Sequence, residues 1–112
     1  MESKRQQKIS RLLQRDLGEI FQQVTRNHRQ GYLITVTKVN ITPDMSLARV
    51  FLSLFGPGNK EEVFNWVKHQ KSEIRHQLGI RTKNQLRIIP DLEFFIDDSL
   101  DYIENIDNLL NA

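Results

Sequence analysis

The chain has 112 residues, of which 38% are hydrophobic and 27% are charged, and it contains no cysteine. This length is typical of one domain, so we expect residues 1–112 to form a single domain around a small core. The lack of cysteine excludes disulfides and thiolate metal sites. The N-terminus is polar and no apolar stretch approaches the ~20 residues that span a bilayer, which predicts a cytoplasmic protein without a membrane partner.

The formal net charge of +2 conceals an uneven distribution of charge along the chain. Residues 1–90 hold all 16 Lys and Arg but only 7 of the 14 Asp and Glu, whereas residues 91–112 hold the other 7 acids and no Lys or Arg. This asymmetry indicates a polyanionic partner for the basic part and an acidic face kept away from that partner. The alternative is a scatter of solvated charges without a common partner.

An amphipathic helix is predicted near the N-terminus, with Ser3 as its N-cap. Its apolar residues recur at helical spacing, namely Ile9, Leu12, Leu13, Leu17, Ile20, Phe21 and Val24. At ~100° per residue, four cations fall within roughly 60° of one another and nearly opposite that stripe. These cations are Lys4, Lys8, Arg11 and Arg15. A stripe of one sign predicts phosphate contact, and a plain solvated helix face is the alternative.

Two strands are predicted after this helix. Residues 33–41 are rich in β-branched side chains, and residues 47–55 alternate between apolar and mixed positions. The segment 42–46 between them contains Pro43 and Asp44 and is typical of a turn. A short turn between two strands predicts an antiparallel hairpin. Its core-facing residues would be Ala48, Val50, Leu52 and Leu54.

A second helical region is predicted to begin at the N-cap Asn59. Its apolar face runs over residues 63–78 and is interrupted at Gln70 and Lys71. Gly79 is predicted to end this helix or to bend it sharply.

The last part of the chain begins at Pro90. Residues 92–96 alternate as a third strand, and Ser99 can cap a final short helix. The resulting order, α-β-β-α-(kink)-α-β with a C-terminal helix, predicts an α+β fold in which helices cover one face of a three-stranded sheet.

Several other site hypotheses compete with phosphate binding. His69, Glu73 and His76 would share one helical face and could ligate a metal, but without a motif such a set is more often solvated. The carboxylates of residues 91–101 could hold a cation, although a run of acids is usually a solvated surface. No phosphate loop, nucleophile elbow or Cys-His pair is present, so we expect no enzyme, no cofactor and no small-molecule substrate.

Phe51 and Phe55 lie on the second face of the predicted hairpin. They could stack on bases, but packing of that face is the more common role of such side chains.

Motifs along most of the chain occur in an order that resembles one family, ribosome-binding factor A (RbfA). The residues that carry the resemblance are Leu13–Gln22; Asp44, Ser46, Ala48, Val50 and Phe51; Ile74, Arg75, Leu78 and Gly79; Leu86, Arg87, Pro90, Leu92 and Phe94; Asp97, Ser99 and Leu100; and Ile106, Leu109 and Leu110. The family's fold is a type II KH-like domain. The resemblance places a kink between two paired helices at Gln70, Lys71 and Ser72, where the family usually shows A-x-G.

The resemblance implies a monomeric factor that binds immature 16S rRNA in the small (30S) ribosomal subunit and assists its late maturation. A KH-like helix pair would approach the RNA backbone at its junction, and cations there would contact phosphates. The predicted RNA-binding residues are the four of the first helix together with Lys68, Lys71, Arg75, Arg81, Lys83 and Arg87. The alternative function is a protein-interaction module whose basic face docks an acidic protein.

Overall fold

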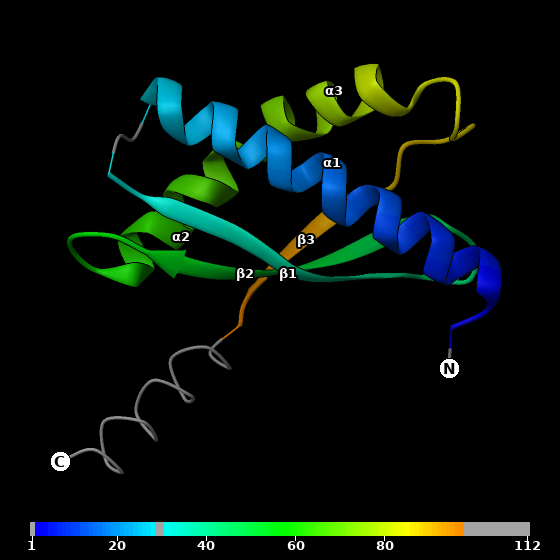
Figure 1. Ribbon diagram of the computed structural model, residues 1–112, viewed down its shortest axis with the longest axis horizontal. Coiled ribbons are helices and arrows are strands. Elements are labelled where there is room, and N and C mark those ends of the chain that lie inside the picture. The colour runs from blue at the N-terminus through cyan, green and yellow to red at the C-terminus, as the bar shows by residue number, and fades with distance from the viewer. Residues whose placement is uncertain (1, 29–30, 98–112) are drawn as a thin grey trace, which may run out of the picture.

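The computed structural model describes residues 2–28 and 31–97 (Figure 1). The elements follow one another as α1 (Lys4–His28), β1 (Leu33–Ile41), β2 (Leu47–Phe55), α2 (Lys60–His69), α3 (Lys71–Thr82) and β3 (Asp91–Ile96). This order confirms the predicted α+β, KH-like arrangement. The final helix expected from Ser99 lies outside the described residues.

The sheet has the strand order β1-β2-β3. The predicted hairpin is antiparallel, whereas β3 runs parallel to β2. A β-bulge places Thr37 as an extra residue in β1, between the pairs Val36–Leu52 and Lys38–Phe51. The bulge changes the alternation of side chains, so that Val36 and Val39 both face the core.

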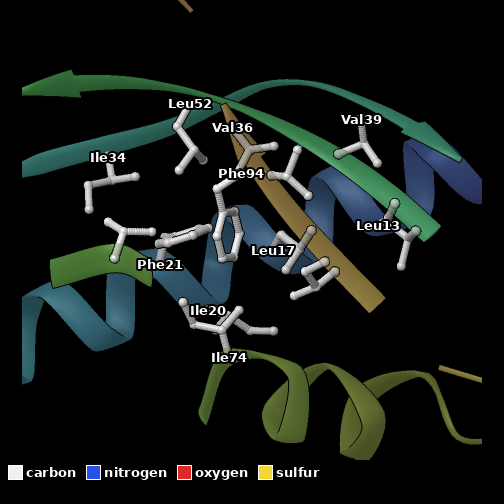
Figure 2. Packing of buried hydrophobic residues seen from close by; sticks show 14 of the residues in the cluster. Leu13, Leu17, Ile20, Phe21, Ile34, Val36, Val39, Leu52, Ile74 and Phe94 are labelled. Atoms are coloured by element: carbon white, nitrogen blue, oxygen red, sulfur yellow. The ribbon is translucent and has the colours of Figure 1, made fainter. Parts of the chain in front are cut away.

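The helices cover one face of this sheet. In Figure 1, α1 crosses the strands and α3 lies beside it on the same side. Figure 2 shows the core between these layers, with Phe21 and Leu17 of α1 facing Phe94 of β3 and Ile74 of α3. The rings of Phe21 and Phe94 meet edge to face, with their centroids 5.9 Å apart. The buried stripe of α1 therefore joins the sheet to α3, as its helical spacing predicts.

The ends of the helices follow local capping rules. Ser3 Oγ accepts a hydrogen bond from the Gln6 backbone N–H, and Gln6 Oε1 accepts one from the Ser3 backbone N–H, which completes a capping box at α1. At α2 the side chain of Asn59 accepts a hydrogen bond from the backbone N–H of Glu61. Both predicted N-caps are confirmed.

The helix pair is divided at Gln70, which ends α2 and precedes α3. The break therefore lies where the apolar face is interrupted, as expected. The prediction that Gly79 ends or bends the helix is wrong, because α3 continues through it to Thr82. A Cβ at Gly79 would meet Ile89 Cγ1 at 3.5 Å, an ordinary contact, so neither a turn nor a close approach requires glycine there.

Within the ranges that the structure covers, no helix is both long and apolar enough to cross a membrane.

Candidate nucleic-acid interface

The β1–β2 turn is held by a carboxylate. Asp44 Oδ1 accepts hydrogen bonds from Thr42 Oγ1 at 2.8 Å, from Ser46 Oγ at 2.8 Å and from the Ser46 backbone N–H at 3.1 Å. The Thr42 hydroxyl first, and then the two Ser46 donors, lower the pKa of Asp44. The next residue, Met45, has a φ of 63°, which is uncommon for a residue other than glycine. The turn thus holds a partly buried methionine side chain on a backbone of positive φ.

The segment between α3 and β3 is anchored by Arg75. Its Nε donates to the Pro90 carbonyl at 3.1 Å and its Nη2 donates to the Ile89 carbonyl at 2.9 Å. Ile89 packs on the core cluster from the same segment. The two carbonyl bonds hold the return of the chain against α3, and they fix where Arg87 and Ile88 lie.

The β1–β2 turn, the α3–β3 segment and the N-terminal half of α1 line a hollow with a volume of about 870 Å³. We call it the hairpin hollow. Arg5 and Lys8 of α1 and Arg87 of the α3–β3 segment line it together with apolar side chains. The apolar side chains are Ile9, Leu12, Pro43, Met45, Leu86 and Ile88. Lys8 and Arg87, predicted from two separate regions of the sequence, therefore share one concave surface.

Arg11 and Arg15 lie farther along α1. They line a shallower hollow between that helix and Val36 of β1. Arg15 Nε lies 3.5 Å from Asp16 Oδ1, and its side chain remains 66% exposed. Lys4, Lys8, Arg11 and Arg87 are exposed, and the structure shows no ion pair for them within the described ranges.

Three predicted RNA-binding cations of the second helical region are instead tied to the protein itself. Lys71 Nζ lies 3.3 Å from Asp91 Oδ1, and Arg81 pairs with Glu19 and more distantly with Asp16 of α1. The third is Arg75, whose guanidinium is bound to carbonyls. Lys71, Arg75 and Arg81 thus have partners within the protein, and their contact with RNA stays a prediction.

The remaining cations of this region lie on two different surfaces. Lys68 Nζ is 4.9 Å from the ring centroid of Phe64, and Lys68 lines a hollow with Asp91 and Glu93 of β3. Asp91 and Glu93 of β3 thus lie beside Lys68 and Lys71. Because residues 98–112 lie outside the described ranges, the expected separation of the acidic face from the RNA stays a prediction. Lys83 lines another hollow, with exposed Ile80 and with Gly79 of α3.

The competing site hypotheses also change in the fold. The helix break at Gln70 separates His69 from Glu73 and His76, so the three side chains do not share one helical face. In the part of the chain that the structure describes, no group of three or more potential ligands is placed to hold a metal ion. Phe51 stacks on Phe95 with their ring centroids 5.2 Å apart, so its aromatic face already has a partner in the protein.

Comparison with known proteins decides the family. The family model described as ribosome-binding factor A matches residues 5–110. The chain belongs to the ribosome-binding factor A family. A relative with that name from Christiangramia forsetii is 46% identical over 112 residues, which cover 99% of this chain and 86% of the relative.

Solved structures of other RbfA proteins share the fold. The crystal structure of ribosome-binding factor A from Thermus thermophilus is similar with a TM-score of 0.69 and 22% identity, over 81% of this chain and 94% of that one. A T. thermophilus RbfA homology model, fitted into a cryo-EM map of a 30S-RbfA complex, is similar with a TM-score of 0.65 and 24% identity, over 79% of this chain and 90% of that one.

Arg5 and Met45 are among the residues of the hairpin hollow that were not predicted as site residues from the sequence. Arg5 precedes Ile9 by four positions and Leu12 by seven, so it borders the apolar stripe of α1, and this spacing could have placed it there. Met45 gives no comparable signal, because its positive φ follows from the route of the turn.

Proposed function

We propose that this chain binds the small (30S) ribosomal subunit by contacting 16S rRNA, and that it assists late maturation and processing of that RNA in the precursor subunit without catalysing a reaction. The observation that carries the proposal is the group of cations without ion pairs on neighbouring surfaces of the described residues, Lys4, Lys8, Arg11 and Arg87, in a chain of this family. Such side chains can replace the counterions of RNA phosphates.

Membership of the family supports ribosomal RNA as this polyanion. The homologue from T. thermophilus was fitted into a map of a complex with the 30S subunit, and relatives of this chain carry the name ribosome-binding factor. A phosphate-rich surface is the partner that best suits a long helix with exposed cations in three successive turns.

Cosedimentation with precursor small subunits tests the proposal. Binding should weaken steeply as salt is raised, because each neutralised phosphate releases counterions. Mature subunits and isolated 16S rRNA serve as comparisons. If the chain does not bind precursor subunits or RNA at low salt but binds an acidic ribosomal protein, the protein-interaction alternative is supported instead.

A further inference from the structure

We propose that the hairpin hollow receives an unpaired base of single-stranded RNA, while Arg5, Lys8 and Arg87 at its rim hold the phosphates on either side of that base. The inference rests on the proposed function and adds the class of RNA that the site takes. A surface for phosphates alone would need only the cations, whereas this hollow also has an apolar lining.

The hollow is large enough to hold a base, and the chemistry of its lining is suited to one. The volume of about 870 Å³ lies within the range of roughly 300–1,000 Å³ typical of ligand sites. Ile9, Met45 and Leu86 are partly buried against the core, and Ile88 at the edge is 73% exposed. A large aliphatic side chain that stays so exposed beside cations can cover the face of a base once RNA is bound.

Charge favours RNA over a protein as the occupant. Arg5, Lys8 and Arg87 have no ion pair in residues 2–28 and 31–97. Among the described residues that line the hollow, Asp44 is the only acidic one. That carboxylate already accepts three hydrogen bonds within the turn. The basic rim therefore matches single-stranded RNA, which carries one negative phosphate per nucleotide and a flat base that can enter the apolar hollow.

Met45 lies at the edge of the hollow in a conformation that glycine adopts more readily. Its φ of 63° is uncommon for a residue other than glycine and follows from the route of the turn. Glycine would adopt this conformation without a penalty. Met45 supplies a flexible, polarizable side chain at the edge of the hollow instead, which suits contact with the flat face of a base.

The test compares three RNA probes of about 12 nucleotides by fluorescence anisotropy: a mixed-sequence single strand, the same backbone without bases, and a duplex. The wild-type chain should bind the single strand about tenfold more tightly than the baseless strand or the duplex. Met45→Gly and Ile88→Ala should each lose about five- to tenfold for the single strand and nothing for the baseless strand. Leu33→Ala is the matched control, because Leu33 is an exposed aliphatic side chain on the sheet, outside the hollow.

Both variants should remain folded. Ile88 is mostly exposed. At position 45 glycine relieves the positive φ, which offsets part of the packing lost with the partly buried methionine side chain, and thermal melts check that each variant is folded at the assay temperature. If the wild-type chain binds precursor subunits but does not distinguish the single strand from the baseless strand, or if the two variants bind like Leu33→Ala, the base site is wrong and the proposed function stands. Failure of the wild type to bind subunits or any RNA would overturn both.

Discussion

The cations around the hairpin hollow and the cations of α3 differ in the partners that the fold gives them. Arg5, Lys8 and Arg87 face a concave surface and have no ion pair in the described part of the chain. Lys71 and Arg81, by contrast, bridge to carboxylates on other elements. A cation already neutralised by the protein releases few counterions on binding RNA, so a count of Lys and Arg overestimates the phosphate-binding surface.

Arg75 shows the difference most clearly. Its position in the sequence resembles that of a family cation, yet its guanidinium spans the Ile89 and Pro90 carbonyls. It therefore positions the segment that carries Arg87 toward the hollow. Arg75 and Arg87 are twelve residues apart and contribute to the same surface in different ways, one by anchoring and one by contact.

The largest effect on binding should come from reversing charge at the hollow. Lys8→Glu combined with Arg87→Glu should lower affinity for precursor subunits at least about a hundredfold, because two phosphate contacts become two repulsions. The melting temperature should change little, since both side chains are exposed and form no ion pair with the described residues. Cosedimentation and thermal melts measure the two effects. A folded double variant that binds like the wild type would remove the hollow from the interface.

Loss of the Arg75 anchor should lower the free energy of unfolding by more than it weakens the free energy of RNA binding by the folded chain. Arg75→Ala should lower the free energy of unfolding by about 1–2 kcal/mol, because two charge-assisted hydrogen bonds are lost. Urea titrations measure this change. Arg75→Lys should recover only part of it, because an ammonium group lacks the planar fork that reaches both carbonyls. An unchanged unfolding midpoint for Arg75→Ala would mean that the anchor does not contribute to the fold.

A smaller effect is expected at the bridge between α1 and α3. Arg81→Ala should cost about 0.5–1 kcal/mol of stability, because Glu19 is about half exposed and water screens the pair. Glu19→Gln should cost about the same amount, and the double variant should be less destabilised than the two single changes added together. Strict additivity in such a cycle would show that the pair contributes nothing in solution.

The smallest effect is a pH dependence at Asp91. The hydrogen bond from the Leu92 backbone N–H, followed by Lys71, lowers the pKa of Asp91 in the folded chain. A carboxyl whose pKa is lower when folded stabilises the fold above its unfolded pKa, and this contribution is lost as pH falls through the folded value. Asp91→Asn should therefore melt slightly below the wild type at neutral pH, and the two curves should converge in acid. If the difference in melting temperature between Asp91→Asn and the wild type persists unchanged at low pH, ionisation of Asp91 is not its cause.

Local patterns were sufficient to predict the elements of the fold. The apolar stripe of α1, the caps Ser3 and Asn59 and the break near Gln70 all depend on residues close together in the chain. The bulge at Thr37 was not predicted, because it depends on the register between β1 and β2. Gly79 was misassigned because glycine often ends a helix, and here packing of Ile74 and Leu78 carries α3 past it.

The site was less predictable than the fold for a related reason. The exposed cations of α1 could be recognised from helical spacing alone. The partners of Lys71 and Arg81 lie 20 and 62 residues away in the sequence, so their ion pairs depend on tertiary structure. The same is true of the hairpin hollow, which joins α1 to a turn and to the chain that leaves α3.

The salt dependence of RNA binding tests the distinction between the two groups of cations most directly. Lys8→Gln/Arg87→Gln and Lys71→Gln/Arg81→Gln each remove two positive charges, so their net charges are equal. For single-stranded RNA, the slope of log affinity against log salt should become shallower by about 1.4 in the first variant, because each lost phosphate contact contributes about 0.7. The second variant, kept below its melting temperature, should retain the wild-type slope. Equal changes of slope in both variants, or a change only in the second, would contradict the account.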